Sequence, residues 1–343
     1  MAMMRTMAAT VALTALGASA WAQGTPSATP VKFSLDWSYQ GYHAPWTEAA
    51  DQGFFAHEGL AVTMDRGYGV TDTISKVAAG TYDIGQADIN ALVKFDADNP
   101  GRRVITFFQV YDMNENAIMT LKRTGITKPR DLEGKTIVSA EADAPRLLFP
   151  AFARVNGIDT SKIAWTMVAP NLRDSLMVQG RGDAVTGYTI TSIFNMIGAG
   201  ARRDDIVVLP YATLGIDLYG AGLITTQAYA DAHPELLRAF VRAAIRGFDA
   251  ALQDPKGGVA SVLKRDPLLN PAIELDRLDM AIESAILTPY VKANGYGAID
   301  PARMEKLVAI NAEAYNVANP PKPDELYSTR FLPPQSERMP ARR

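Results

Sequence analysis

The sequence predicts an α/β fold of two lobes, each a mostly parallel sheet flanked by helices. Three observations lead to this prediction. Short apolar segments with strand character alternate with amphipathic segments of helical period, which is typical of parallel sheets covered by helices. The chain has 343 residues, and this length suits two domains. Two turn-rich segments, at 111–117 and 210–217, divide the strands into two sets and fit connections between lobes.

The first 22 residues have the pattern of a Sec-type signal peptide. A single charge at Arg5 precedes an apolar run, and small residues close the segment, so we expect cleavage after Ala22. The apolar run is shorter than the roughly 20 residues that a membrane span needs. We therefore expect an exported, periplasmic protein whose mature chain starts with a flexible segment, 23–30.

The composition argues against several classes of protein. Hydrophobic residues make up 48% of the chain, so it is not a disordered protein. The formal net charge of -3 gives no electrostatic reason to expect a nucleic acid or an anionic membrane as a partner. The chain has no cysteine, which excludes disulfides and a lipid anchor on cysteine.

The first lobe is expected to comprise 31–113 and 217–343. Pro45 suits the first turn of a helix that Gly53 can close, because proline is tolerated at a helix start and glycine favours a helix end. In chain order we expect a strand at 31–35, a helix at 45–53, a strand at 60–64, a helix at 71–80, a strand at 82–86, a helix at 88–96 and a strand at 104–110. A last strand at 219–225 precedes an almost purely helical C-terminal part.

The second lobe is expected at 114–216. Asp143 can cap a helix that Gly157 ends, and Pro150 inside that helix predicts a kink because it lacks a backbone donor. In chain order we expect strands at 117–121 and 136–139, a helix at 143–157, a strand at 164–168, a helix at 172–179, a strand at 183–187, a helix at 189–199 and a strand at 206–209.

Aromatic and polar side chains follow the predicted strands, where open parallel sheets bind their ligands. The candidate ligand-binding residues are Trp37, Tyr39, His43, Tyr68, Gln86, Asp88, Tyr111, Glu141, Asp143, Arg146, Tyr188 and Asp217. Flat aromatic side chains with a polar group suit stacking on a flat ligand, although a tyrosine near a strand end can equally pack beneath a loop. Together they favour a planar solute.

The polar candidates leave two interpretations open. Glu141 and Asp88 could accept hydrogen bonds from an aminopyrimidine or another amine-bearing ring. Arg146, with free N–H groups at a helix start, could instead hold a carboxylate or a sulfonate. Arg173 and Arg66 are less well placed relative to the strand ends, and we leave them out of the candidate site.

Motifs along the whole mature chain resemble a known family. They are LDW at 35–37, His43, QGFFAHEGLAV at 52–62, GTYDIG at 80–85, DLEGKTI at 131–137, GRGDAV at 180–185 and LPYATLGIDLYGAGLI at 209–224. Their order and spacing are similar to those of solute-binding proteins of ABC importers, in the group that binds thiamine pyrimidine precursors and sulfonates. The resemblance implies a type II periplasmic binding fold with two hinge crossings.

The same resemblance implies a function. The protein is expected to be a monomeric receptor, without a cofactor, that captures a small aromatic or heteroaromatic compound by lobe closure. The solute would be of the thiamine pyrimidine precursor type or an aromatic acid, and sulfonate-type or nitrate-type anions are the alternative. The implied partner is an ABC permease in the inner membrane, which would dock on both closed lobes.

An enzymatic alternative comes from a second resemblance. Trp37, Tyr42 and His43 resemble the W-x-x-x-x-Y-H opening of the yeast-type pyrimidine synthase, which uses its own histidine as substrate. That enzyme has a cysteine-rich iron motif, whereas this chain has no cysteine, and it is intracellular. His43, His57 and His233 lack the spacing of metal ligands, and neither a nucleophile elbow nor a phosphate-binding loop occurs. We therefore expect no enzyme activity and no metal site.

Overall fold

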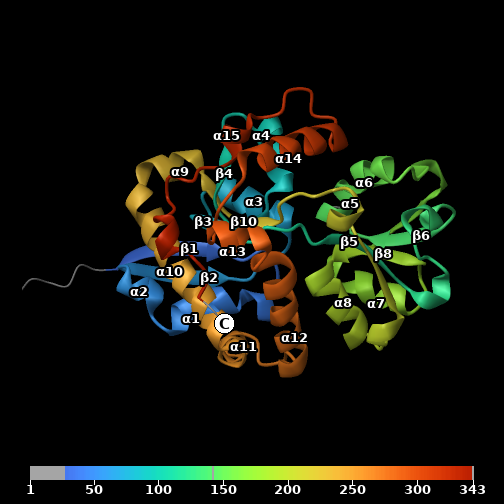
Figure 1. Cartoon of the computed structure of the whole chain (residues 1–343), viewed down its shortest axis with the longest axis horizontal. Helices are drawn as coiled ribbons and strands as arrows, with labels where there is room; N and C mark the ends of the chain where they lie inside the picture. Colours follow the sequence, from blue (N-terminus) through green and yellow to red (C-terminus); the bar gives the residue numbers. More distant parts are fainter. Residues whose placement is uncertain (1–27, 141–142, 342–343) are drawn as a thin grey trace, which may run out of the picture.

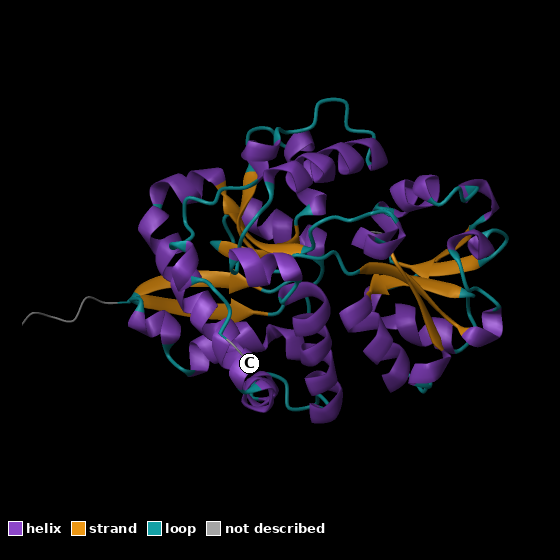
Figure 2. Ribbon diagram, viewed as in Figure 1, coloured by secondary structure: helices purple, strands orange, loops and turns teal. Residues whose placement is uncertain are grey.

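The computed structural model describes residues 28–140 and 143–341. Its strands form two five-stranded sheets, in the orders β2-β1-β3-β10-β4 and β7-β6-β8-β5-β9. The first sheet contains β1 (Thr29–Ser34), β2 (Leu60–Asp65), β3 (Ile84–Asp88), β4 (Val104–Gln109) and β10 (Ala221–Thr226). The second contains β5 (Asn116–Leu121), β6 (Thr136–Ser139), β7 (Ala164–Met167), β8 (Ala184–Tyr188) and β9 (Ile206–Pro210). Figure 1 shows the two sheets in separate lobes, and Figure 2 shows helices on the faces of each sheet.

One strand in each sheet runs against its neighbours. In the first sheet β1 pairs in parallel with β2 and β3, whereas β10 pairs antiparallel with β3 and β4. In the second sheet β6 pairs in parallel with β7 and β8, whereas β5 pairs antiparallel with β8 and β9. Each reversed strand is the first one after the chain changes sheets, so it enters from the end where the other strands finish. The predicted fold class, with a mostly parallel sheet in each lobe, is confirmed.

The helices of the two lobes follow the same plan. The first lobe contains α1 (Ala44–Asp51), α2 (Phe54–His57), α3 (Val70–Ala78) and α4 (Asn90–Asp98) before the chain leaves it, and the second contains α5 (Ala144–Leu147), α6 (Phe149–Val155), α7 (Arg173–Val178) and α8 (Thr189–Gly198). The predicted helix at 143–157 is interrupted at Leu148, between α5 and α6. Pro150 in the first turn of α6 explains this break, because its ring excludes the backbone N–H that a continuous helix requires.

The C-terminal part returns to the first lobe as a series of helices. They are α9 (Gln227–Ala232), α10 (Pro234–Gln253), α11 (Pro255–Leu263), α12 (Pro271–Ala281), α13 (Pro289–Asn294), α14 (Pro301–Ala314) and α15 (Pro323–Leu326). Six of these helices begin with proline, which has a helical φ and lacks only an N–H that would be unpaired at that position. No helix within 28–140 or 143–341 is long and apolar enough to cross a membrane.

An aromatic core fastens this C-terminal part to the first sheet. Phe33 of β1 packs edge-to-face on Trp46 of α1 and on Phe240 of α10, with ring centroids 5.6 and 5.4 Å away. All three side chains are buried, and such pairs add to the stabilisation from apolar burial. Helices α1 and α10 approach closely at Gly247, where a Cβ would come within 2.1 Å of the Pro45 carbonyl oxygen. Glycine at this position therefore permits the contact that holds α10 in the first lobe.

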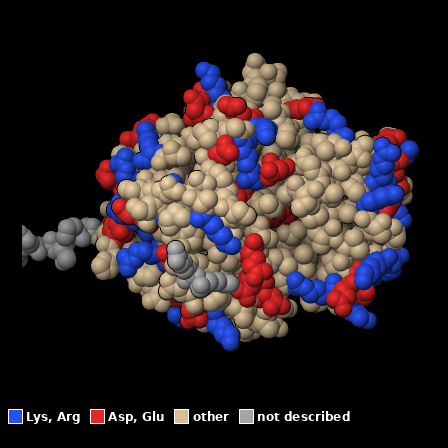
Figure 3. Space-filling view, viewed as in Figure 1, with Lys and Arg blue, Asp and Glu red and all other residues tan. Residues whose placement is uncertain are grey.

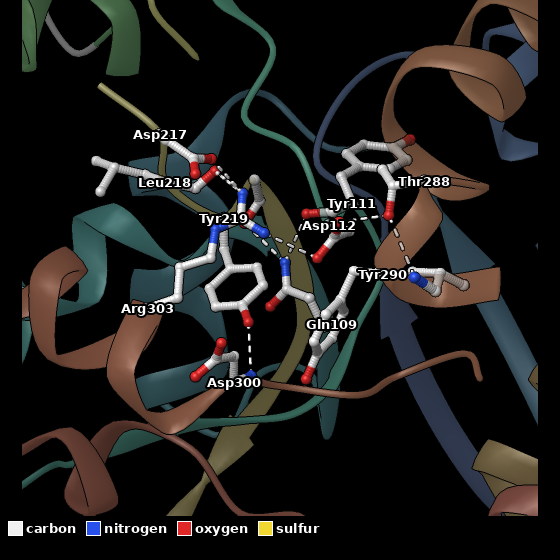
Figure 4. A network of polar contacts seen from close by, with 12 residues as sticks. Gln109, Tyr111, Asp112, Asp217, Leu218, Tyr219, Thr288, Tyr290, Asp300 and Arg303 are labelled. Carbon is white, nitrogen blue, oxygen red and sulfur yellow. Dashed lines mark hydrogen bonds and ion pairs between the residues drawn. The ribbon is translucent and has the colours of Figure 1, made fainter. Parts of the chain in front are cut away.

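Two crossings connect the sheets, between β4 and β5 and between β9 and β10. Arg303 of α14 contacts both, because Nη1 donates to Asp112 Oδ1 at 2.9 Å and Nη2 donates to Asp217 Oδ1 at 2.7 Å. Figure 4 shows this guanidinium between the two carboxylates, above the ring of Tyr219. Asp112 also accepts a hydrogen bond from Thr288. A single cation thus ties both crossings to the C-terminal part of the first lobe.

Candidate ligand-binding cleft

The main cavity lies between the lobes and has a volume of about 570 Å³, a size that suits a small molecule. The first lobe contributes Asp36, Trp37, Tyr42, Tyr68, Gly69, Val70, Thr71, Asp72 and Ser75, and the second contributes Ala140, Asp143, Ala144, Val168, Pro170, Arg173, Tyr188 and Thr191. Basic and acidic side chains are interspersed over both lobes on the face shown in Figure 3. The sequence predicts a ligand site beyond the carboxyl ends of the strands. The cavity lies there, because the segments after β1, β2, β6 and β8 all line it.

Two loops of the first lobe hold aromatic side chains at the cavity. Gly67 donates to the Trp37 carbonyl oxygen at 2.9 Å, and Gly69 donates to the Asp36 carbonyl oxygen at 3.0 Å. A Cβ on Gly67 would come within 2.1 Å of backbone oxygen, so this close approach requires glycine. Between the two glycines the Tyr68 side chain is 63% exposed. A large aromatic group left open to solvent at a cavity is a feature typical of binding sites.

Asp36 is held by two side chains that lie behind it. The backbone N–H of Gln40 donates to His43 Nδ1 at 3.1 Å, so the imidazole proton sits on Nε2, which donates to Asp36 Oδ1 at 2.8 Å. Gln86 Oε1 accepts from Trp46 Nε1 at 2.6 Å, which turns the Gln86 amide nitrogen toward Asp36 Oδ2 at 3.4 Å. These contacts fix the orientation of the Asp36 carboxylate at the cavity wall.

The wall on the second lobe is built around a buried ion pair. Arg173 Nη1 donates to Asp143 Oδ2 at 2.5 Å, Nε donates to Asp174 Oδ1 at 3.3 Å, and Nη2 donates to Ser192 at 2.8 Å. Asp143 also accepts from Thr186 at 2.8 Å. The guanidinium charge is therefore balanced by two carboxylates in the same lobe.

A small recess continues the cavity toward the crossings. It has a volume of about 10 Å³ and is lined by Asp36, Tyr42, Tyr111, Glu115, Tyr188, Ile190, Thr191, Gly220 and Ala221. This is the size of a single water site or of one small polar substituent. Burial raises the pKa of Glu115 well above its ordinary value, and the negative charges of Asp36 and Asp88 raise it further by smaller amounts.

The structure brings five of the predicted residues to these cavities. Trp37, Tyr68, Asp143 and Tyr188 line the main cavity, and Tyr111 lines the recess. Ligand contact by these five residues stays a prediction. Glu141 lies outside the described residues.

Three predicted residues lie immediately behind the cavity instead of lining it. His43 is fully buried and holds Asp36. Gln86 and Asp88 were expected after a strand at 82–86, but β3 begins two residues later and includes both. The strand bounds differ from the prediction because β3 is buried on both faces, so its sequence does not show the alternation that marks strand ends. Asp88 accepts from the Tyr188 hydroxyl at 3.3 Å and thereby supports a cavity residue.

Three further predicted residues lie away from the cavity. The Tyr39 hydroxyl donates to the Met64 carbonyl oxygen at 3.0 Å, and its ring packs on the core of the first lobe. The Arg146 guanidinium lies over the Trp165 ring, 5.6 Å from its centroid. Asp217 pairs with Arg303 at the crossings. Tyr39 and Arg146 follow predicted strands and Asp217 lies in the predicted crossing, but a tertiary contact directs each side chain elsewhere.

Sequence reasoning missed several lining residues, among them Asp36, Tyr42, Arg173, Glu115 and Thr191. Asp36 follows the first strand directly, so the rule that selected Trp37 could have found it, and Tyr42 follows in the same segment. Arg173 is separated from β7 by a short 3-10 turn, which hides its proximity to the strand end. Glu115 lies in the first crossing, and Thr191 lies in the first turn of α8.

The arrangement of histidine and acidic side chains bears on metal binding. Within the described ranges, no group of three or more histidine, aspartate or glutamate side chains is arranged to hold a metal ion.

Relatives of the chain include binding proteins and enzymes. The formylaminopyrimidine-binding protein of Halalkalibacterium halodurans is 26% identical over 285 residues, which cover 81% of this chain and 83% of that protein. The 4-amino-5-hydroxymethyl-2-methylpyrimidine phosphate synthase of Aspergillus parasiticus is 23% identical over 259 residues, which cover 72% of this chain and 74% of that enzyme.

Solved structures with the same fold include periplasmic binding proteins. The aliphatic sulphonate binding protein SsuA of Escherichia coli has a TM-score of 0.67 at 12% identity. The superposition covers 89% of this chain and 99% of the SsuA chain. The nitrate-binding protein NrtA of Synechocystis PCC 6803 has a TM-score of 0.66 at 10% identity and covers 90% of this chain and 88% of its own. At such identities the similarity shows the fold alone.

A family model described as NMT1/THI5 like matches residues 40–257. This match agrees with the resemblance that the motifs indicate, and it spans the strands and loops that line most of the cleft. Because it covers more than half of the 343 residues, the protein belongs to the NMT1/THI5-like family.

Proposed function

We propose that the protein is the solute-binding receptor of an ABC importer and captures a small heteroaromatic compound with an amino group in the cleft between its lobes. The observation that carries this proposal is the joint presence, in one cavity, of Trp37, Tyr68 and Tyr188 with an acidic wall. The aromatic side chains come from both lobes, so a ring held among them would contact both. A ligand with that property favours the closed arrangement by its higher affinity for it.

The charges of the cavity distinguish between the two kinds of solute. Among the described residues, Asp36, Asp72 and Asp143 line the wall together with one basic residue, Arg173, which is already paired with carboxylates. Asp72 at the rim is paired with Lys76 at 2.7 Å. Such a wall is electrostatically unfavourable for a sulfonate, a nitrate or an aromatic acid, and favourable for an amino group. Arg146, the group expected to hold an anion, is not among the described residues that line the cavity, which also favours the amine-bearing solute.

The enzymatic alternative finds less support in the site. His43 corresponds by motif to the histidine that the yeast-type synthase uses as substrate. In this chain it is fully buried, and both ring nitrogens are engaged, with Gln40 and with Asp36. A histidine in that position acts on the cavity by orienting Asp36. The relatives named as synthases nevertheless make this the alternative to exclude.

Location and partner follow from the proposal. The similar sulphonate-binding and nitrate-binding proteins are periplasmic, which supports export of this chain to the same compartment. A receptor of this kind delivers its solute to an inner-membrane permease, which would contact surfaces of both lobes.

A binding screen tests the proposed function. The mature protein would be titrated calorimetrically with 4-amino-5-hydroxymethyl-2-methylpyrimidine, a formylaminopyrimidine, benzoate, ethanesulfonate and nitrate. We expect saturable binding of an aminopyrimidine and no binding of the inorganic or sulfonate anions. Tight binding of ethanesulfonate or nitrate, with none of any aminopyrimidine, would overturn the proposed solute class.

The receptor class has its own test. A ligand recovered from the denatured complex is expected to have its original mass, because the site offers no nucleophile with a paired base. Conversion of the ligand into a new species, detected by mass spectrometry, would favour the enzymatic alternative.

A further inference from the structure

Glu115 lines the recess, and one oxygen of its buried carboxyl group has no hydrogen-bond partner among the described residues. Glu115 belongs to the crossing between β4 and β5, and only 7% of its surface is exposed. Its backbone carbonyl oxygen accepts from Thr189 N at 3.0 Å, which fixes the residue, whereas Oε1 is buried and has no hydrogen-bond partner among the described residues. Buried polar atoms are normally paired, so an unpaired one that faces a cavity indicates a missing partner.

The polar side chains around the recess are carboxylates and hydroxyls. Asp36 is already bound to His43 and Gln86, and Asp88 is already bound to Asn90 and to the Tyr188 hydroxyl. Hydroxyl-bearing side chains complete the polar lining, namely Tyr42, Tyr111, Tyr188 and Thr191.

The neighbouring cation is engaged elsewhere. Arg277 of α12 packs beside the recess, where its Nη1 donates to the carbonyl oxygens of Ile190 and Thr191 at 2.6 and 3.0 Å. Its charge is balanced by Glu274, because Nε donates to that carboxylate at 3.0 Å. The environment of Glu115 therefore combines two carboxylates with an arginine that already has its own counter-ion.

These surroundings favour the neutral acid form of Glu115. A second or third carboxylate in a buried space is costly unless a cation compensates it, and the pKa of Glu115 is raised first by burial and then by Asp36 and Asp88. A carboxylic acid offers one O–H donor beside one acceptor oxygen. Its complement is a group with an acceptor beside a donor, such as a ring nitrogen next to an exocyclic amino group.

The dimensions of the recess limit what can enter it. A volume of about 10 Å³ admits one small substituent but not a ring. The recess shares Asp36, Tyr42, Tyr188 and Thr191 with the main cavity. A ring in the main cavity that turned one edge toward the recess would therefore bring that edge toward Glu115, with the rest of the ring among the aromatic side chains.

We propose that the recess is a subsite for the amino-substituted edge of the ligand ring, with Glu115 as the residue that selects it. In its acid form Glu115 donates to a ring nitrogen and accepts from the adjacent exocyclic amino group. This inference rests on the proposed function, because it assigns the edge of an amino-bearing ring to one side chain. A ring without the amino group leaves the buried oxygen unpaired and binds more weakly.

Two substitutions of Glu115 test whether it acts on the ligand as a neutral acid, with a donor beside an acceptor. Glu115→Gln keeps a donor beside an acceptor in nearly the same shape, whereas Glu115→Leu removes both. With 4-aminopyrimidine as the probe, we expect Glu115→Gln to bind within about 3-fold of wild type and Glu115→Leu to bind roughly 10- to 100-fold more weakly. Pyrimidine, which lacks the amino group, should bind the wild type and Glu115→Leu with similar, low affinity. Circular dichroism and thermal unfolding would establish that both variants fold.

An infrared measurement tests the ionisation of Glu115 without any ligand. The difference spectrum between wild type and Glu115→Gln at neutral pH is expected to contain the carbonyl band of a protonated carboxyl group. Absence of that band would overturn the inference even if aminopyrimidines bind. Equal losses in the Gln and Leu variants, or wild-type affinity in the Leu variant, would also overturn it.

The two proposals fail in different ways. If the wild type binds an anion and none of the aminopyrimidines, both the proposed function and this subsite are wrong. If the wild type binds aminopyrimidines but the variants or the infrared spectrum disagree as described, the proposed function stands and only the role of Glu115 is wrong.

Discussion

Single residues in the cleft act either by facing the cavity or by orienting a residue that does. Trp37 faces it and, being a large flat side chain, would contact a bound ring directly. Arg146 does neither, because its guanidinium lies over Trp165 in the second lobe. Substitution of each of these two residues therefore distinguishes ligand binding by ring stacking from binding by anion capture.

Substitution of these two residues should have unequal effects on binding. We expect Trp37→Ala to weaken binding of an aminopyrimidine by about 1–3 kcal/mol, the worth of lost aromatic burial and stacking. Arg146→Ala should leave the affinity nearly unchanged. Titration calorimetry on both variants decides the matter, and the reverse result, with affinity lost only in Arg146→Ala, would indicate an anionic solute.

Asp96 is expected to make the free energy of unfolding depend on pH. Asp96 is buried, and burial raises its pKa to about 7, although it accepts a hydrogen bond from Val104 N at 3.0 Å. The folded state thus binds a proton that the unfolded state releases at lower pH, so this group makes stability fall as pH rises between about 4 and 7. The slope is at most about 1.4 kcal/mol per pH unit.

Asp96→Asn should remove that dependence. We expect the variant to lose less stability than the wild type between pH 5 and pH 8, as measured by urea unfolding at each pH. Parallel curves for the two proteins would show that Asp96 is ionised in the folded protein at both pH values.

Glu115 differs from the residues that were predicted to line the cleft. Trp37, Tyr68, Asp143 and Tyr188 lie where a strand meets a loop or helix, and this position can be read from the order of apolar and polar residues. Glu115 could not be found in this way, because its importance comes from burial and from missing a partner, which only the packing of both lobes defines.

At the level of elements, the two crossings depend on a helix that lies far away in the sequence. Arg303 of α14 binds the buried Asp112 of the first crossing and the exposed Asp217 of the second, as Figure 4 shows. A buried carboxylate that loses its cation is strongly destabilising, whereas an exposed ion pair contributes little.

Substitutions at these elements should follow that difference. We expect Arg303→Ala to lower the free energy of unfolding by roughly 3 kcal/mol and Asp217→Asn, the matched control, to lower it by less than about 1 kcal/mol. Urea unfolding of both variants measures the two values. Equal effects would mean that the Asp112 contact contributes no more than the exposed one.

Element order could be predicted because alternation of strand and helix signals is local. The fully buried β3 was placed two residues early, since a strand without a solvent-facing side lacks the period that marks its ends. The kink near Pro150 was predicted correctly, because a missing backbone donor disrupts a helix in any context. The bond from Arg303 to both crossings was not predicted, because its partners lie 191 and 86 residues away.

On the scale of the whole molecule, the lobes meet beside the cleft as well as at the crossings. Arg277 of α12 donates to carbonyl oxygens at the start of α8, and Thr191 donates to Gln40 Oε1 at 3.1 Å. Arg154 of α6 pairs with Glu313 of α14. These contacts join the two lobes around a cavity that both of them line.

Closure of the lobes around an amine-bearing ring is the central claim, and small-angle scattering tests it directly. The radius of gyration of the mature protein would be measured alone and with saturating 4-amino-5-hydroxymethyl-2-methylpyrimidine, after calorimetry has established the affinity. A ligand that contacts both lobes, as we propose, favours the closed arrangement, so we predict a smaller radius in its presence. An unchanged radius with saturating, tightly bound ligand would contradict capture by closure.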